Sequence, residues 1–156
     1  MKLNFKTQGD REILFFRSFN APRQMVWDAH TKPELIRRWL LGPDGWEMPD
    51  CTVDLRVGGK FRYAWRNTSD GRTMAMGGVY REIDAPAKMV HTEVFDEDWT
   101  GGETTVTTLF AEIDGRTEME MTVVYASANA RDGALKTGMT RGMEAGYERM
   151  EKMLAG

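Results

Sequence analysis

The sequence predicts a single α+β domain in which a curved antiparallel sheet of about seven strands wraps around a long C-terminal helix. Apolar and polar residues alternate with a period of two in several runs between residues 51 and 125. Short Gly-, Asn- and Asp-rich turns separate these runs, and an apolar stripe at helical spacing ends the chain. The chain has 156 residues, the size of one domain, so we expect residues 1–156 to form one unit.

The N-terminal part predicts one strand followed by two short helices. Residues 11–19 read as a strand, although two adjacent phenylalanines blur the alternation. Pro22 suits the first turn of a helix that continues to about Ala29, because a proline there sacrifices no hydrogen bond. A second helix is expected over residues 33–40, where Pro33 again stands at the start.

The central strands follow from the alternation. Residues 51–57 place their apolar side chains on one face, as do residues 60–66, and residues 67–71 form the hairpin turn between the latter and the next strand. The apolar residues of the first run are Cys51, Val53, Leu55 and Val57, and those of the second are Phe61, Tyr63 and Trp65.

The later strands are joined by turns and one longer loop. They are expected at residues 74–83, 88–95, 104–113 and 117–125. The loop 96–103 carries Trp99, and Asp114-Gly115 makes a tight hairpin turn. Consecutive strands joined in this way form an antiparallel meander with one solvent-exposed face. The C-terminal helix is expected to cover the other face and to leave a pocket between helix and sheet.

A single helix is expected from about residue 132 to 154. Its apolar stripe recurs every three or four residues. The stripe consists of Leu135, Met139, Met143, Tyr147, Met150 and Leu154. Gly138, Gly142 and Gly146 lie four apart along the same helix, and each costs about 1 kcal/mol relative to alanine. We therefore expect the sheet backbone or a neighbouring helix to pack closely against this glycine edge.

Composition narrows the functional classes. The net charge is −3 and the pI about 5.5, which weighs against a nucleic-acid partner. Cys51 is the single cysteine, so there is neither an internal disulfide nor a cysteine-rich zinc module. His30 and His91 have no metal-ligand spacing, and we expect no metal and no cofactor. The sequence shows no signal peptide and no membrane span, so we expect a soluble, cytoplasmic protein.

Several motifs together resemble a known superfamily. They are PELIRRW at residues 33–39, GPDGW at 42–46, VDLRVGGKF at 53–61, GVYREI at 78–83, KMVHT at 88–92, DGRT at 114–117, and GMTRG at 138–142 with the helix that follows it through Arg149-Met150. The sequence resembles the SRPBCC (START-like, helix-grip) superfamily and, within it, the bacterial homologues of the activator of heat-shock-protein-90 ATPase. The resemblance covers about residues 12–155.

The resemblance implies the helix-grip fold and leaves the activity open. The superfamily includes lipid and steroid carriers, polyketide cyclases, hormone receptors and co-chaperones, so the fold alone assigns no reaction. Two positions depart from the family pattern. Met143 stands where the family commonly has a tryptophan, and Gly146 stands where it often has a serine. Both departures lie on or beside the pocket edge of the helix and put the ligand, not the fold, in doubt.

The expected pocket lining is rich in aromatic residues and methionines, which make a large and adaptable apolar wall. The candidates are Trp39, Phe61, Tyr63, Trp65, Met76, Met119, Met121, Met139, Met143 and Tyr147. The chain has 12 methionines, which also suit simple core filling. The loops at residues 42–46 and 96–103 are candidates for the mouth of the pocket.

His91 and Glu93 are the catalytic candidates. They lie two apart on one expected strand and so share a face with Met89 and Phe95. If that face is concave, both enter the pocket and can act as acid and base on a bound carbonyl compound. The alternative register puts Val90, Thr92 and Val94 inside. Asp54 and Arg56, by contrast, are expected to form a structural surface ion pair.

Three functions remain open from the sequence. The first is the binding of a small hydrophobic or amphipathic molecule. The second is a cyclase, dehydratase or hydrolase that uses His91 and Glu93. The third is regulation of a chaperone partner, for which the sequence itself offers little support. An exposed edge strand or the glycine edge of the helix also leaves a homodimer open.

Overall fold

The computed structural model describes residues 2–97 and 101–156, and within them eight strands form one antiparallel sheet. The spatial order is β1-β2-β8-β7-β6-β5-β4-β3, so the strand that follows the first turn pairs with the last strand of the chain. The strands are β1 (Asn4–Gln8), β2 (Glu12–Phe19), β3 (Trp46–Val53), β4 (Lys60–Asn67), β5 (Thr73–Asp84), β6 (Lys88–Phe95), β7 (Thr104–Ile113) and β8 (Arg116–Val124).

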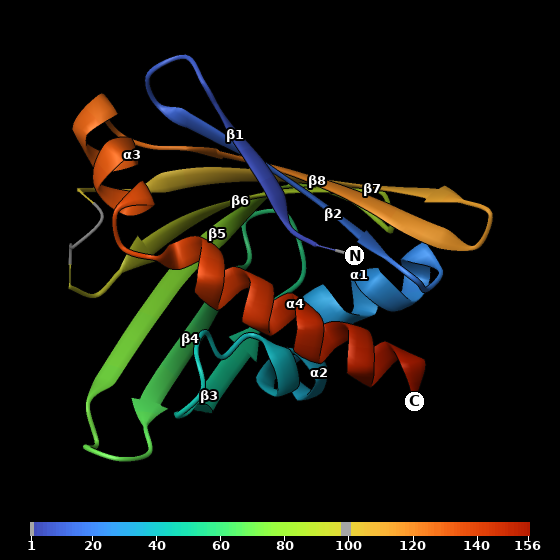
Figure 1. Ribbon diagram of the computed structural model, residues 1–156, viewed down its shortest axis with the longest axis horizontal. Helices are drawn as coiled ribbons and strands as arrows, with labels where there is room; N and C mark the ends of the chain where they lie inside the picture. The colour runs from blue at the N-terminus through green and yellow to red at the C-terminus, as the bar shows by residue number, and fades with distance from the viewer. Residues whose placement is uncertain (1, 98–100) are drawn as a thin grey trace.

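Four helices accompany the sheet in the described residues. They are α1 (Arg23–Thr31), α2 (Pro33–Trp39), α3 (Ala128–Leu135) and α4 (Met139–Ala155). Figure 1 shows α4 running across one face of the sheet, with α1 and α2 beside its C-terminal half and α3 at its other end. We call the face toward α4 the inner face. The C-terminal helix and the sheet around it give the expected helix-grip arrangement.

The core lies between the inner face of the sheet and the helices. In β4 the side chains of Phe61, Tyr63 and Trp65 are buried, whereas Lys60 and Arg62 are exposed. This is the alternation that the sequence predicted for residues 60–66. Burial of such large aromatic side chains stabilises each by about 2–3 kcal/mol relative to exposure, which makes this row a main anchor of the sheet.

The sheet has one more strand than expected. β1 is exposed along its whole length and pairs only with β2, from Asn4 opposite Phe16 to Gln8 opposite Glu12. Because none of its side chains is fully buried, the sequence carries no apolar alternation there for a strand prediction to use.

The strand expected at residues 51–57 is shifted. β3 begins at Trp46 and ends at Val53, and the chain then turns through Gly58 and Gly59. Leu55 and Val57 are 40% and 65% exposed, so the expectation that they share a buried face is wrong. A Cβ on Gly59 would lie 2.0 Å from the carbonyl oxygen of Asp54, and this close approach is what the turn requires.

The long C-terminal helix is two helices. α3 ends at Leu135, and Gly138 caps the start of α4 with φ of 78°, a left-handed conformation that breaks a continuous helix. The expectation of one continuous helix from about residue 132 to 154 is therefore wrong, because the helix is interrupted between Leu135 and Met139. The expected close packing along the glycine edge is present at Gly146, where a Cβ would lie 3.0 Å from the carbonyl oxygen of Trp39.

The turns agree with the expectations. Gly71 N–H donates to the carbonyl of Asn67 at 3.0 Å, which closes the hairpin at residues 67–71. Asp114 and Gly115 both have positive φ, 52° and 75°, as the tight turn between β7 and β8 requires. The adjacent glycines Gly77 and Gly78 suggest an interruption of the strand at residues 74–83, but this expectation is wrong, because β5 continues through them.

Candidate ligand-binding site

The inner face of β6 is the one that carries His91 and Glu93. The imidazole of His91 lies 5.3 Å from the ring of Phe61 and 6.3 Å from the ring of Tyr80, measured between centroids. Met89 on the same face is 4% exposed, whereas Val94 on the other face is 40% exposed. The register that would place Val90, Thr92 and Val94 inside is therefore not the one adopted.

His91 and Glu93 form a hydrogen-bonded pair. Nε2 of His91 lies 2.9 Å from Oε2 of Glu93, and the two side chains are 14% and 29% exposed. In a neutral imidazole, donation from Nε2 to the carboxylate leaves Nδ1 as an acceptor. Nδ1 of His91 is fully covered and has no hydrogen-bond partner among the described residues. The pair thus combines a partly accessible carboxylate with an unsatisfied ring nitrogen.

The charge of Glu93 acts on three buried tyrosines from different parts of the chain. Burial raises the pKa of Tyr63 well above its usual value, and the neighbouring Tyr80 phenol and the charge of Glu93 add to this. Burial, then the charge of Glu93, raises the pKa of Tyr125 to about 12, and the same two causes raise the pKa of Tyr147. The phenols of Tyr63 in β4, of Tyr125 just after β8 and of Tyr147 in α4 are therefore all protonated near neutral pH.

Trp39 and Tyr147 connect α2 to α4 at the edge of this region. Their rings stack at 5.6 Å with an angle of 23° between the planes. The indole N–H of Trp39 donates to the carbonyl of Ala29 at 2.8 Å, which fixes the ring. Both side chains are 4% exposed, so they act first as core residues.

The structure divides the expected pocket lining between two apolar clusters. Most of the candidates belong to the larger cluster, beneath the C-terminal half of α4 and along β4 and β5. They are Trp39, Phe61, Tyr63, Trp65, Met76, Met119 and Tyr147. Met121 and Met139 pack against the smaller cluster around Ile13, Phe15 and Tyr125, and Met143 packs against both. Leu3 also packs against both, so the clusters meet at Met143 and Leu3.

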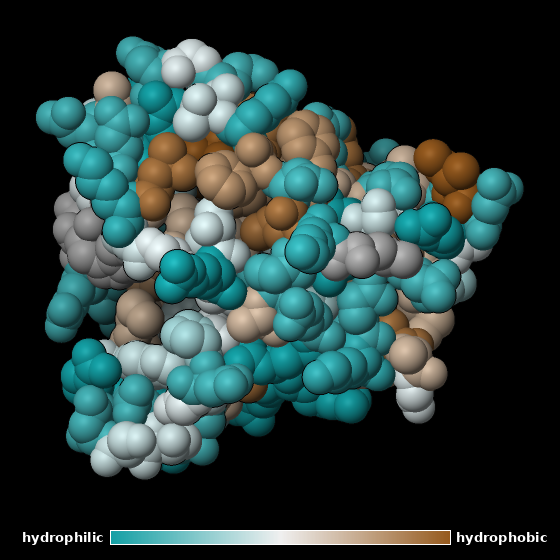
Figure 2. Space-filling model, in the orientation of Figure 1, coloured by the Kyte–Doolittle hydropathy of each residue, from teal (hydrophilic) through white to brown (hydrophobic). Residues whose placement is uncertain are grey.

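The smaller cluster reaches the surface between α3, β1 and the start of α4. Figure 2 shows apolar surface there. The half-buried apolar residues of these elements are Leu3, Leu135, Met139 and Met143, and Phe5 beside them is 47% exposed. We call these five residues the apolar rim. Phe5 pairs with Phe15 in register and therefore points to the inner face.

His30 was not among the expected lining residues, yet it lies on the inner side. Its ring is 5.1 Å from that of Trp39 and 5.0 Å from that of Phe110. The pKa of His30 is lowered to about 4: burial lowers it most, the hydrogen bond to Val26 partly opposes this, and the nearby His91 adds a smaller lowering effect. No local pattern marks His30, because its aromatic neighbours come from α2 and from β7, which lies about 80 residues further along the chain.

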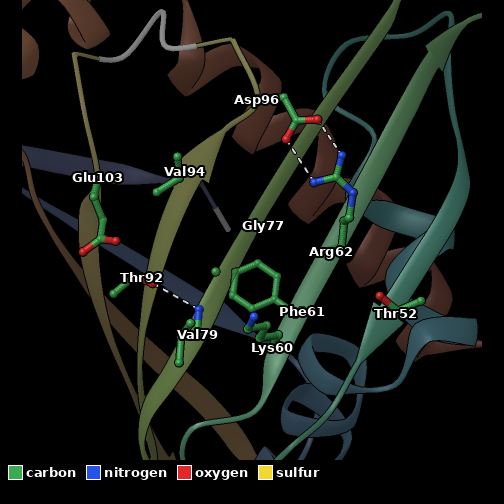
Figure 3. Close-up of a pocket in the computed structure, with 11 residues that line it drawn as sticks. Thr52, Lys60, Phe61, Arg62, Gly77, Val79, Thr92, Val94, Asp96 and Glu103 are labelled. Carbon is green, nitrogen blue, oxygen red and sulfur yellow. Dashed lines mark hydrogen bonds and ion pairs between the residues drawn. The ribbon is translucent and has the colours of Figure 1, made fainter.

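Two hollows of about 430 Å³ each lie on the outer face of the sheet, away from α4. In the first, Arg62 and Asp96 face each other beside Gly77 and join through two hydrogen bonds of 2.9 and 2.5 Å (Figure 3). Val79 N–H donates to the hydroxyl of Thr92 at 3.0 Å on its floor. These polar groups already have partners, whereas the charged side chains of Lys60 and Glu103 line the same hollow without a hydrogen-bond or ion-pair partner among the described residues.

The remaining candidates are structural. Arg56 Nε and Asp54 Oδ2 pair at 2.8 Å on the surface, as expected. Cys51 is buried, and burial raises the pKa of its thiol to about 11, so it is protonated and unreactive near neutral pH. In the loop 42–46, the carbonyl of Gly42 and the carboxylate of Asp44 accept hydrogen bonds from Arg149 of α4. Trp99 lies outside the described residues.

Residues 2–97 and 101–156 lack two further features. No group of three or more His, Cys, Asp or Glu side chains there is arranged to hold a metal ion. None of the helices in this part of the chain has both the length and the apolar character needed to cross a bilayer.

Comparisons with known proteins agree with the fold. The family model described as "Activator of Hsp90 ATPase homolog 1-like protein" matches residues 20–155. A crystal structure of a protein from Rhodobacter sphaeroides is 34% identical, with 99% of each chain covered and a TM-score of 0.93. A solution structure of an AHSA1-like protein from Aeromonas hydrophila is 21% identical, covers 91% of this chain and 93% of its own, and has a TM-score of 0.74; it supports the fold alone. No curated protein gives a significant match.

Proposed function

The chain belongs to the Activator of Hsp90 ATPase homolog 1-like family, and we propose that it binds a small hydrophobic or amphipathic molecule on the inner face of its sheet, beneath α4. The observation that carries the proposal is the apolar rim. Phe5, Met139 and their neighbours stay partly exposed together where the helix stops covering the sheet. Contiguous exposed apolar surface of this kind often marks a binding site.

The rim is continuous with the polar interior. The hydroxyl of Tyr125 lies 3.6 Å from the sulfur of Met139, and the charge of Glu93 acts on Tyr125 in turn. An amphipathic molecule that displaces the methionines of the rim would meet His91 and Glu93 with its polar end. Methionine side chains are flexible and polarizable, so they suit such displacement.

A thermal-shift screen tests the proposal. The probes are fatty acids, sterols, flavonoids and aromatic polyketides. A ligand at one hundred times its dissociation constant adds about 2.7 kcal/mol to the free energy of unfolding, which gives a measurable rise in Tm. At least one class is expected to raise Tm.

Two arginine variants make the screen specific for the rim. Met139→Arg places a charge in the rim and is expected to abolish the rise in Tm. Ile113→Arg, at a side chain that is 57% exposed at the far tip of β7, is the matched control and is expected to leave it unchanged. A flat screen with the wild-type protein, or equal effects of the two variants, would refute the proposal.

A second candidate function is acid–base catalysis by His91 and Glu93. The 2.9 Å contact between them carries it, because His91 can hold the partly exposed carboxylate of Glu93 in place, where the carboxylate can act as the base. Once a ligand is known, Glu93→Gln is expected to keep ligand binding and to lower turnover at least a hundredfold. Absence of any product from the wild-type protein over a prolonged incubation would exclude this function.

The family description also names activation of the Hsp90 ATPase. If the ligand screen is flat, this becomes the function to test next, by adding the protein to the chaperone and measuring ATP hydrolysis. An unchanged rate of ATP hydrolysis would exclude this function.

A further inference from the structure

Glu93 keeps an accessible carboxylate on the inner face of an interior strand. β6 has β5 and β7 on its two sides, so a side chain on its inner face reaches solvent only across that face. The side chain of Glu93 is 29% exposed. Its Oε2 lies 2.9 Å from Nε2 of His91, and its Oε1 makes no hydrogen bond within the described residues. One carboxylate oxygen is therefore free to accept a hydrogen bond from a ligand.

The neighbouring strands leave room beside this carboxylate. In the register of β5 and β6, Glu93 faces Gly78, which has no side chain. A Cβ there would lie 1.8 Å from the carbonyl oxygen of Thr92 and 2.7 Å from the ring of Phe61, so the position must stay without one. On β7, the partner of Glu93 is Thr104, whose side chain is short. Neither neighbouring strand therefore covers the carboxylate with a long side chain.

Glu93 lies level with the apolar rim. The register continues from Glu93 through its partner Thr104 to Tyr125, which directly follows β8. Strands lie about 4.8 Å apart, so two strands separate Glu93 from the backbone of Tyr125 by about 10 Å. The hydroxyl of Tyr125 lies 3.6 Å from the sulfur of Met139, a residue of the rim. A molecule with its apolar body at the rim can therefore bring a polar end to Glu93.

No lysine or arginine among the described residues forms an ion pair with Glu93. Arg17, the buried arginine of the inner face, pairs instead with Glu144 and Glu151 of α4. A hydrogen on Nδ1 of His91 would be buried without an acceptor, so the imidazole is neutral and donates from Nε2. The negative charge of Glu93 thus has no cation beside it.

Aromatic rings border the carboxylate on its β4 side. Phe95 shares the inner face with Glu93, and its ring lies 6.4 Å from the ring of Trp65. The ring of Trp65 lies 6.0 Å from that of Tyr63, which is 4.9 Å from that of Phe61. The faces of aromatic rings attract cations. A free carboxylate oxygen beside such rings is suited to an ammonium group.

We propose that the bound molecule is an amphipathic amine whose protonated nitrogen donates a hydrogen bond to Oε1 of Glu93 while its apolar body occupies the apolar rim. This inference rests on the proposed function and names the ligand class. An alkyl amine, like a lysine side chain, has a pKa of about 10 and is protonated near neutral pH. A fatty acid would instead place a second negative charge beside Glu93. An alcohol can donate to Oε1 but supplies no charge.

Two series of ligands with matched apolar bodies test the assignment in the wild-type protein. The first is decylamine, 1-decanol and decanoate, and the second is 2-naphthylmethylamine, 2-naphthalenemethanol and 2-naphthylacetate. Calorimetry at pH 7 gives the dissociation constants. In a series that binds, the amine is expected to bind about tenfold more tightly than the alcohol, which corresponds to about 1.4 kcal/mol, and the acid most weakly. An alcohol or an acid that binds as tightly as the amine would overturn the assignment.

The variant Glu93→Gln locates the interaction. Glutamine keeps the size of the side chain and removes its charge, so the preference for the amine is expected to vanish while the alcohol still binds. Glu103→Gln is the matched control: it changes the net charge equally on the outer face, in the first hollow, and should keep the preference (Figure 3). A preference that survives in Glu93→Gln, or that falls equally in both variants, would overturn the assignment. Catalysis by Glu93 predicts instead that Glu93→Gln keeps its affinity and loses turnover.

A spectroscopic readout covers the case in which Glu93→Gln does not fold. In wild-type protein with ¹³C-labelled glutamate side chains, decylamine is expected to shift the carboxyl resonance of Glu93 and to leave that of Glu103 in place. No shift at Glu93 on saturation would also overturn the assignment. If neither amine binds, the assignment to an amine falls, and the other probes of the thermal-shift screen decide separately whether the proposed function falls with it.

Discussion

The two halves of α4 carry the same apolar stripe but lie in different environments. In the C-terminal half, Tyr147 is 4% exposed and Met150 is completely buried. In the N-terminal half, Met139 and Met143 are only half-buried. The spacing is the same, so the difference comes from what covers the helix: α1 and α2 lie beside the C-terminal half, whereas the N-terminal half faces the apolar rim (Figure 1). The C-terminal half holds the helix on the sheet, and the N-terminal half is the one that the proposed ligand site uses.

Ionic contacts hold α4 along most of its length but not in its first turn. Arg17 of β2 is almost fully buried and pairs with Glu144 at 3.4 Å and Glu151 at 3.0 Å, both on α4. Arg149 donates to the carbonyl of Gly42 at 2.7 Å and to Asp44 at 2.9 Å, which ties α4 to the loop after α2. All of these contacts lie beyond the first turn of α4, so Met139 is left without an anchor of this kind.

The largest expected contrast is between two methionine truncations. Met150→Ala leaves a cavity at a fully buried position and is expected to lower the free energy of unfolding by about 3 kcal/mol. Met139→Ala removes a half-buried side chain and is expected to cost less than about 1 kcal/mol. Urea denaturation of both variants measures this, and equal losses would show that the halves of α4 are equivalent.

Removal of Arg17 tests the ionic anchor. Arg17→Met leaves two carboxylates, each a quarter exposed, without their cation, and is expected to cost about 2–3 kcal/mol. Arg56→Met removes an exposed ion pair and is the control, with an expected change within about 0.5 kcal/mol. Neutralising the carboxylates as well, with Glu144→Gln and Glu151→Gln, should recover part of the loss. If it recovers none, the loss comes from packing rather than charge.

The pH dependence of stability tests the burial of His30. Its pKa is about 4 in the folded chain and about 6.5 when unfolded, so the unfolded state binds more protons between these values. The free energy of unfolding should therefore fall as the pH falls from about 6.5 toward 4, by about 3 kcal/mol at most. His30→Phe should lack this component. Parallel curves for the two proteins between pH 4 and 6.5 would contradict the burial of a neutral imidazole.

The smallest expected effects come from the glycines of α4. A Cβ at position 142 would make an ordinary contact at 3.5 Å with Pro43, so Gly142→Ala should gain up to about 1 kcal/mol of helix propensity. A Cβ at position 146 would lie 3.0 Å from the backbone oxygen of Trp39, so Gly146→Ala should gain nothing or lose stability. Thermal unfolding compares the two, and a clear gain at both positions would show that α2 is not held closely against α4.

Much of the fold could be predicted because its signals are local. The alternation in β4, the turn at Asp114-Gly115 and the stripe of α4 each depend on residues within a few positions of one another. The family resemblance pointed to the same fold. Where local signals were absent or ambiguous, the prediction failed: β1 has no buried face, and Leu55 and Val57 alternate like a strand although the chain turns there.

The candidate site was predictable only in part. The placement of His91 and Glu93 on one face follows from a spacing of two, but the choice of the inner face depends on Phe61 and Tyr80 from other strands. No local sequence pattern indicated that His30 lies on the inner side. Its position against Trp39 and Phe110 arises only when α1 packs between α2 and β7.

By itself, the sequence determined the class of fold, the aromatic face of β4, the shared face of His91 and Glu93, and a C-terminal helix with an apolar stripe. The tertiary structure decided which half of that stripe is sealed, where the helix breaks at Gly138, and that His30 faces inward. The physical reason is the range of the interactions. Backbone conformation and side-chain periodicity depend on near neighbours, whereas burial, pKa and access to a ligand depend on elements that are distant in the chain.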